Sequence, residues 1–265
     1  MQRFSLLSLA VLLPLVGLAA SAGSVSAADD LDLAPEVTIS PDEETGGGLY
    51  LRGDVGYTLA RHSGDVEFTI GGVDGAFDDS RFGRPLAGSI GLGTSLSDIL
   101  RTDVTAEYFQ GRFDGDVDVA TPCAGQPAGT GCSTAVDADY KALSLMANAY
   151  VDLATIAGVT PYLGAGLGAT YLDWSSVEAR ARCASGPCPG TGAVETGYRG
   201  QDDWRFTYAL MAGASYDVSD RVKLDVNYRY SDVAGGGFAK GSGVDAEDDG
   251  FSRHEIRAGL RFSLN

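Results

Sequence analysis

Apolar and polar side chains alternate along most of the chain after residue 47. Between Gly48 and Leu59, for example, Leu51 and Val55 share one face with Tyr57, and the intervening residues are polar or small. Alternation with a period of two predicts a β-strand that has one face in an apolar medium. The alternating segments run to about ten residues, the length that a tilted strand needs to cross a bilayer.

Eight segments carry this pattern, and the links between them alternate in length. The segments span residues 48–59, 86–94, 101–111, 138–153, 161–173, 204–218, 222–230 and 255–264. Short links fall near residues 96–100, 154–160 and 219–221, and long links near residues 61–83, 114–137, 175–202 and 231–251. Short turns at one end and long loops at the other are typical of outer-membrane barrels, whereas a soluble sandwich has no reason to segregate its loops in this way.

The apolar faces of the segments require closure into a barrel. Lipid offers backbone groups no hydrogen-bond partner, so a sheet in a bilayer must close and leave no edge. Tyrosines recur toward the segment ends, as an interfacial girdle requires; they are Tyr57, Tyr108, Tyr171, Tyr216, Tyr228 and Tyr230. The fold class that we predict is all-β, an eight-stranded antiparallel up-and-down transmembrane β-barrel with long extracellular loops, formed by residues 48–265.

The opposite faces of the same segments collect charged residues of both signs. We assign these residues to the lumen: Arg52, Asp54, Asp103, Glu107, Lys223, Asp225, Arg229, Glu255, Arg257 and Arg261. An eight-stranded barrel is only wide enough for its own side chains. We therefore expect these charges to pair with one another and to plug the lumen. The glycines at positions 164, 166 and 168 are expected to leave room for larger neighbours or to ease strand curvature.

The N-terminal region predicts export. Arg3 precedes an apolar stretch from Leu6 to Leu18, and Val25-Ser26-Ala27 supplies a small-x-small cleavage signal, so residues 1–27 are predicted to be a secretory signal peptide. Residues 28–47 contain seven acids and no base, which predicts a flexible acidic periplasmic leader. A membrane anchor is the alternative for the first segment, although Pro14 and Gly17 interrupt it.

The net charge and the cysteines narrow the picture further. The formal net charge is −17, and removing residues 1–27 removes only Arg3, which leaves 18 basic and 36 acidic residues. This balance disfavours nucleic acid as a partner. In an oxidising periplasm the four cysteines are expected to pair locally, Cys123 with Cys132 and Cys183 with Cys188. A zinc site is the alternative, but neither pair has CxxC spacing and no histidine lies nearby.

The sequence offers little catalytic chemistry. His254 has Ser252 and Glu255 nearby, but on a strand Ser252 and His254 share a face that Glu255 does not, and a triad needs geometry rather than adjacency. Acidic patches lie in the long links and include Asp114, Asp116 and Asp118, and also Asp245, Glu247, Asp248 and Asp249. None has the spacing of a calcium-binding loop. We expect a solvated acidic rim, no catalytic residues, no metal site and no cofactor.

Four segments resemble the small eight-stranded surface barrels of the opacity-protein and OmpA-like type from alphaproteobacteria. They read GLYLRGDVGY at residues 48–57, PYLGAGLG at 161–168, LDVNYRY at 224–230 and HEIRAGLRF at 254–262. The resemblance implies a bacterial outer-membrane location and contact with outer-membrane lipids, lipopolysaccharide and the barrel insertion machinery. That family usually ends on an aromatic residue, whereas this chain ends Phe262-Ser-Leu-Asn265; Phe262 and Leu264 keep the lipid-facing register, so insertion is still expected.

Such barrels include structural, adhesive, porin-like and immune-evasion proteins, so the resemblance does not select one task. We expect a non-enzymatic surface barrel that stabilises the envelope and displays disulfide-clipped loops to an unknown surface ligand. The alternatives are a small porin that passes ions or small solutes, an adhesin, and a lipid-modifying enzyme.

Overall fold

The computed structural model describes residues 48–63, 66–70, 73–83, 85–119, 123, 126–185, 194–241 and 244–264. The predicted signal peptide and acidic leader lie outside the described residues. Within the described part of the chain, no helix is long and apolar enough to cross a membrane.

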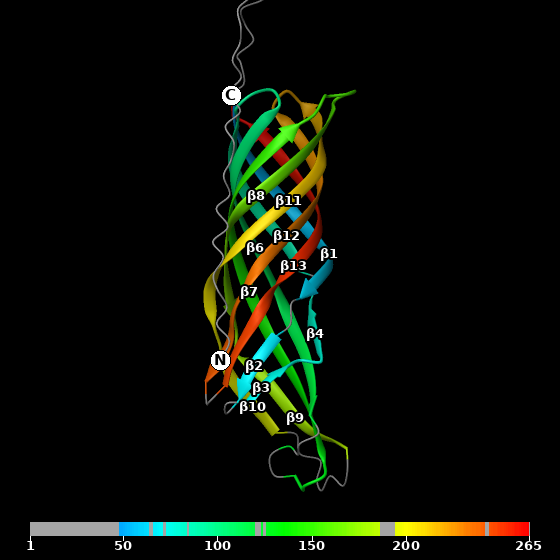
Figure 1. Ribbon diagram of the computed structural model, residues 1–265. Coiled ribbons are helices and arrows are strands. Elements are labelled where there is room, and N and C mark those ends of the chain that lie inside the picture. Colours follow the sequence, from blue (N-terminus) through cyan, green and yellow to red (C-terminus); the bar gives the residue numbers. More distant parts are fainter. Residues whose placement is uncertain are drawn as a thin grey trace, which may run out of the picture. The chain divides into compact units, whose positions relative to one another are not determined.

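Eight strands of the described chain form a closed antiparallel ring, which we call the membrane ring. They are β1 (Leu49–Ser63), β5 (Leu86–Ser95), β6 (Leu100–Val119), β7 (Gly131–Asp152), β8 (Val159–Trp174), β11 (Asp202–Ser219), β12 (Val222–Gly241) and β13 (Val244–Ser263). Each strand pairs with the next in this order, and β13 pairs back to β1. Figure 1 shows the strands tilted around the barrel, and the ring confirms the predicted fold class.

The alternation along each strand separates an outer from an inner face. The outer face is apolar and exposed, as Val55, Ile90 and Leu167 illustrate. In β7, burial alternates residue by residue from Ala138 to Val151. The faces predicted to contact lipid therefore all point outward, because a strand that closes into a narrow barrel has only one side that can meet the bilayer.

Short turns join the strands at one end of the ring. They lie at residues 96–99, 153–158 and 220–221, where the short links were predicted. In the middle turn Ala157 and Gly158 have positive φ angles of 52° and 78°. Glycine adopts this left-handed conformation without steric cost, and it completes the reversal between β7 and β8.

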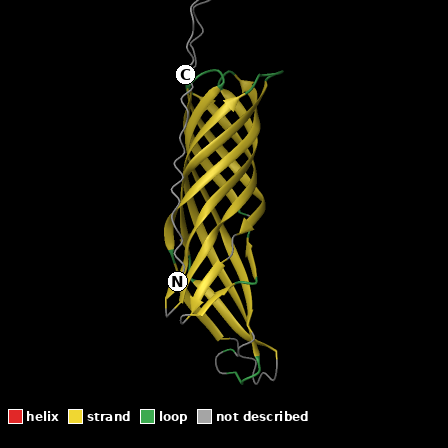
Figure 2. Cartoon of the chain, in the orientation of Figure 1, coloured by secondary structure: helices red, strands yellow, loops and turns green. Residues whose placement is uncertain are grey.

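The long connections at the other end are present, but much of their length is folded into strands. The segments expected to be loops contain five further strands: β2 (Val66–Ile70), β3 (Val73–Ala76), β4 (Asp79–Phe82), β9 (Val177–Ser185) and β10 (Val194–Gly200). The strands β6, β7, β12 and β13 also continue far beyond the predicted segments. Figure 2 shows strands continuing well past the centre of the barrel toward this end.

These additional strands continue the barrel away from the short turns. At this end β9 and β10 lie between β7 and β12, the place that β8 and β11 occupy in the membrane ring. On the other side β2 and β3 follow β13, and β4 pairs with β6. We call these five strands, together with residues 112–119, 131–140, 233–241 and 244–251 of their neighbours, the outer extension.

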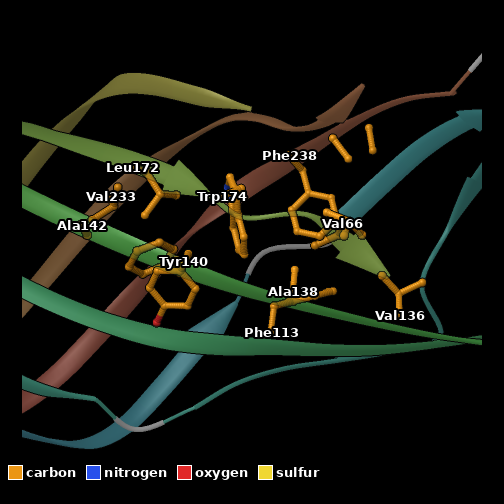
Figure 3. Packing of buried hydrophobic residues seen from close by; sticks show 14 of the residues in the cluster. Val66, Phe113, Val136, Ala138, Tyr140, Ala142, Leu172, Trp174, Val233 and Phe238 are labelled. Atoms are coloured by element: carbon orange, nitrogen blue, oxygen red, sulfur yellow. The ribbon is translucent and has the colours of Figure 1, made fainter. Parts of the chain in front are cut away.

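An apolar core fills the inside of the barrel, from the part of the membrane ring far from the short turns into the outer extension (Figure 3). Its largest members are Phe109, Phe113, Tyr140, Leu172, Trp174, Phe238 and Phe251. Phe113 is fully buried, and its ring lies 5.1 Å from Phe82, 5.1 Å from Phe238 and 6.1 Å from Trp174. Edge-to-face packing of this kind is favourable, and it gives the extension the core of a water-soluble domain.

Glycines of β8 let larger lumen residues lie flat against the wall. A Cβ at Gly164 would collide with the Tyr150 ring, and one at Gly166 with the Asn148 side chain. A Cβ at Gly168 would meet the backbone of Leu145 and the Met146 side chain. Of the two roles expected for these glycines, this geometry supports room for larger neighbours.

Candidate functional site in the barrel lumen

Nine of the ten charged residues that the sequence assigned to the lumen are buried inside the membrane ring. They are Arg52, Asp54, Asp103, Glu107, Asp225, Arg229, Glu255, Arg257 and Arg261. Lys223 differs, because it lies close to the short turn before β12, where its Nζ contacts Asp217 Oδ1 at 2.6 Å and both side chains are partly exposed. Lys223 therefore belongs to the rim and not to the buried network.

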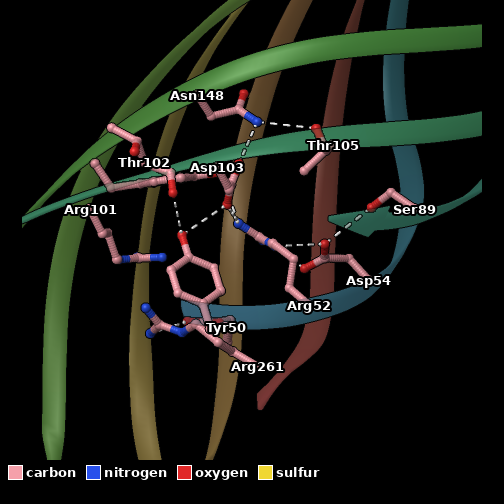
Figure 4. A network of polar contacts seen from close by, with 12 residues as sticks. Tyr50, Arg52, Asp54, Ser89, Arg101, Thr102, Asp103, Thr105, Asn148 and Arg261 are labelled. Carbon is pink, nitrogen blue, oxygen red and sulfur yellow. Dashed lines mark hydrogen bonds and ion pairs between the residues drawn. The ribbon is translucent and has the colours of Figure 1, made fainter. Parts of the chain in front are cut away.

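One cluster of the network surrounds Arg52, toward the end that carries the short turns (Figure 4). The guanidinium of Arg52 donates to both oxygens of Asp54, at 3.0 and 2.7 Å, and its Nη1 donates to Asp103 Oδ2 at 3.0 Å. Asn148 donates to the other oxygen of Asp103 at 2.7 Å, and Tyr150 accepts from Arg52 at 2.8 Å. Such bidentate, charge-assisted bonds hold planar groups in one orientation.

Arg101 lies nearest the short turns and was absent from the predicted set. Its guanidinium stacks between the rings of Tyr150 and Tyr162, at 4.3 and 4.5 Å. Its Nε lies 2.9 Å from both carboxylate oxygens of Asp152. Arg101 is two residues before Asp103 on the same strand, so the period-two pattern could have identified it.

A second cluster centres on Glu107 of β6. Its carboxylate contacts Arg229, Arg253 and Arg257, the last at 2.9 Å. Glu255 lies 3.3 Å from the Arg253 guanidinium. Arg229 projects from β12, which is the strand opposite β6 in the ring of eight, so this contact crosses the lumen. Arg253 was also missed, although it shares the strand face of Glu255.

On the side of this cluster that faces the outer extension, Arg61 lies between the polar network and the apolar core. The Arg61 guanidinium lies 4.0 Å from the Phe251 ring centre, 4.8 Å from that of Phe82 and 5.0 Å from that of Tyr140. It also donates to the Tyr140 hydroxyl. Cation–π contacts of this kind let a charged group border an aromatic core. Going from the short turns toward the outer extension, the lumen therefore holds first paired charges and then packed aromatic rings.

A further buried ion pair joins Arg205 of β11 to Asp248 of the outer extension, a residue expected at an exposed rim. Asp248 is buried, and Arg205 Nη1 donates to its Oδ1 at 2.6 Å. Arg205 Nε donates to Asp203 at 2.7 Å. Burial raises the pKa of Asp248, and the adjacent Arg205 guanidinium opposes that rise. The expectation of a solvated acidic rim is wrong for this residue, although Asp245, Glu247 and Asp249 are exposed.

Acidic side chains do cover the outside of the extension. Asp114, Asp116 and Asp118 all point outward from β6, because Phe113, Gly115 and Val117 take the alternate inner positions. Burial and the hydrogen-bonded Asp137 carboxyl on β7 raise the pKa of Asp114. Like charges opposite each other on neighbouring strands produce such a shift.

Cys123 and Cys132 form a disulfide, with Cα atoms 5.0 Å apart. Cys183 is disulfide-bonded as well, but its predicted partner Cys188 lies outside the described residues, so that pairing stays a prediction. Cys132 and Cys183 are directly opposite each other on β7 and β9. The disulfide-bonded residues Cys132 and Cys183 therefore lie side by side, near the end of the outer extension that is farthest from the membrane ring.

The residues considered for catalysis do not converge. His254 lies on the outer face beside the Tyr228 and Tyr230 rings, whereas Glu255 is buried in the lumen. A serine–histidine–acid relay needs the acid on the histidine ring, which this strand geometry prevents.

Comparisons with known proteins agree with this architecture. Residues 13–262 match the family model of the outer membrane protein beta-barrel domain. A protein of Brucella abortus (strain 2308) whose name assigns it no function is 35% identical over 285 residues, covering 96% of this chain and 98% of its own. A protein of Rickettsia bellii (strain OSU 85-389), which its name classes provisionally as an adhesin, is 27% identical and covers 67% of this chain and 74% of its own.

Among solved structures, Neisserial surface protein A is 18% identical with a TM-score of 0.45, covering 82% of this chain and 97% of its own. OprG from Pseudomonas aeruginosa is 15% identical with a TM-score of 0.44 and covers the same shares. The assignment does not depend on these two likenesses, because the family model spans nearly the whole barrel. This chain belongs to the outer membrane protein beta-barrel family and is located in the bacterial outer membrane.

Proposed function

We propose that this protein is a non-enzymatic outer-membrane surface barrel with a closed lumen, which braces the envelope and carries a folded extension beyond the membrane. The observation that supports it is the continuous filling of the lumen, by the Glu107 and Arg52 clusters in the membrane ring and by the aromatic core above them. A lumen of eight strands has no width to spare once such side chains meet across it.

Single-channel recording in a planar bilayer tests the closed lumen. Refolded mature protein, with folding verified by its heat-shifted gel mobility, is expected to produce no steady conductance steps, while a porin of known conductance produces them in the same bilayers. The opposing observation is that both Nη atoms of Arg101, and the Nε and Nη1 of Arg253, are buried without a hydrogen-bond partner in the described structure. Water normally satisfies such donors. Repeatable steps from folded protein would therefore replace the closed barrel with a small porin.

Adhesion is a second candidate function, and the outer extension favours it. Strand pairing and a packed core hold its exposed acidic face in one conformation, which lowers the entropy that a surface loses when it binds. The provisional naming of the Rickettsia bellii relative as an adhesin points in the same direction.

A cell-attachment assay tests adhesion. Bacteria that display the full chain are expected to attach to host cells more than bacteria that lack it. Replacing three exposed acids of that face with asparagine, at Asp114, Asp116 and Asp118, should abolish the gain. The matched control exchanges the turn at residues 220–221 at the opposite end, which should leave attachment unchanged. Equal attachment with and without the protein would exclude this function.

A further inference from the structure

A groove crosses the lipid-facing side of the membrane ring. It has a volume of about 820 Å³ and runs over β12, β13, β1, β5, β6 and β7. Small residues form its floor, and larger apolar side chains form its walls. The floor consists of Gly53, Gly88, Ala106 and Ala258, and the walls of Val55, Ile90, Tyr108, Leu143, Leu224 and Leu260. Its lining is almost entirely apolar, as a seat for a hydrocarbon chain requires.

The strand register shows that the groove runs obliquely across the membrane-spanning strands, from the short turns toward the outer extension. Its end nearer the short turns is at Leu224 of β12, which is directly opposite Leu260 of β13 and close to the turn at residues 220–221. Its other end is at Tyr108 of β6, which lies directly opposite Leu143 of β7 and close to the outer extension. A chain lying in the part of the groove over Gly88 would therefore run obliquely from the middle of the spanning strands toward Tyr108 and the outer extension.

A polar pocket of about 510 Å³ begins where the apolar groove ends. Gln110 and Lys141 face each other one step above the Tyr108–Leu143 pair, and Arg112 and Asp139 form the next step. The Tyr108 hydroxyl donates to Gln110 Oε1 at 3.4 Å, which links the two cavities. Both cavities therefore belong to one continuous surface along β6 and β7.

Two cations of this pocket are available to a ligand. Arg112 uses only its Nε on Asp139, at 3.1 Å, and its side chain is 62% exposed. Lys141 is exposed and has no carboxylate within ion-pair distance among the described residues. Asp139 and Asp173 line the same pocket and offer acceptors. The pocket thus combines donors for an acidic group with acceptors for hydroxyl or amide groups.

We propose that this surface binds lipopolysaccharide through its lipid A moiety, with one acyl chain in the groove over Gly88 and a phosphorylated glucosamine in the pocket of Arg112 and Lys141. The phosphate pairs with the two cations, and the sugar hydroxyls donate to Asp139 and Asp173. The choice among lipids follows from position, because the pocket lies at the surface from which the outer extension rises, and lipopolysaccharide occupies that leaflet of a Gram-negative outer membrane.

Native mass spectrometry of the refolded mature protein tests the proposal. The protein in detergent is mixed with bis-phosphorylated lipid A, and separately with phosphatidylethanolamine. We expect a retained lipid A adduct at concentrations where phosphatidylethanolamine dissociates. Replacing both cations, Arg112→Ala with Lys141→Ala, should weaken lipid A retention at least about tenfold, as the loss of charge-assisted bonds of ~1.5 kcal/mol or more predicts. Filling the groove with Gly88→Leu should weaken it as well.

Two matched controls make the result specific. Lys240→Ala removes an exposed cation of the outer extension that pairs with Asp245. Ala149→Leu fills a second lipid-facing groove of about 780 Å³, whose lining includes no cation. Both variants should retain lipid A as the unmodified chain does. Equal retention by Arg112→Ala/Lys141→Ala, equal losses in the two controls, or equal binding of phosphatidylethanolamine would each overturn the proposal. All of these side chains face outward, and gel mobility identifies any variant that fails to fold.

Discussion

Replacing Glu107 with glutamine is expected to be among the most destabilising single changes in the membrane ring. Glu107 contacts Arg229, Arg253 and Arg257, and its loss leaves the first two with Glu255 as their one carboxylate partner among the described residues. Removing one partner of a buried ion pair typically costs ~3–5 kcal/mol, because the remaining charges stay buried without compensation. Urea unfolding in lipid vesicles, followed by tryptophan fluorescence and gel mobility, measures the change.

Asp217→Asn supplies the matched control for this prediction. It breaks the pair with Lys223, which is partly exposed, so the expected cost is below about 1 kcal/mol. If Glu107→Gln does not refold, Glu107→Asp preserves the charge and should give an intermediate loss. Similar midpoints for Glu107→Gln and Asp217→Asn would show that the lumen network does not hold the ring together.

Replacing Phe113 with alanine should loosen the outer extension and spare the membrane ring. The Phe113 ring contacts Phe77, Phe82, Trp174 and Phe238 and is fully buried. Truncating a buried phenylalanine costs ~3–5 kcal/mol, which includes the cavity that remains. Hydrogen exchange followed by mass spectrometry is expected to accelerate in β9, β10 and the adjoining parts of β6 and β7, while β5 and β8 stay protected.

Lys240→Ala is the control on the surface of the same extension, and its exchange should match that of the unmodified chain. Acceleration spread evenly over both parts of the barrel would mean that they unfold as one unit. Unchanged exchange after Phe113→Ala would mean that the aromatic core does not stabilise the extension. Either result would remove the distinction between a lipid-stabilised ring and a core-stabilised extension.

The long links illustrate where sequence reasoning failed and why. Residues 113–118 read Phe-Asp-Gly-Asp-Val-Asp, and the three aspartates and the glycine suggest a loop. The same residues also alternate, with Phe113, Gly115 and Val117 on one side of the strand. The opposite side carries aspartates, and neither side is apolar enough to predict contact with lipid. Above the membrane the outer face of a strand meets water, so the pattern that identified the spanning strands is inverted in polarity there.

Arg101, Arg253 and Asp248 illustrate a different limit. The first two lie on strand faces that the alternation had already assigned to the lumen, so the same rule identifies them. Asp248 lies in an acid-rich segment, and its burial and its pairing with Arg205 of β11 show that it points inward. Composition indicates that a segment is acidic, but it does not indicate which of its acids meets an arginine from another strand.

The sequence by itself determined the number of strands in the ring, which face of each strand meets lipid, and nine of the ten lumen charges. It could do so because side chains of a strand alternate with a period of two whatever the rest of the chain does. Only the tertiary structure decided the partners of those charges and the height to which the barrel continues. The partner of each charge depends on how neighbouring strands are staggered and on which strands face each other across the lumen. Glu107 of β6 and Arg229 of β12 meet in this way. No local sequence pattern encodes the stagger of the strands.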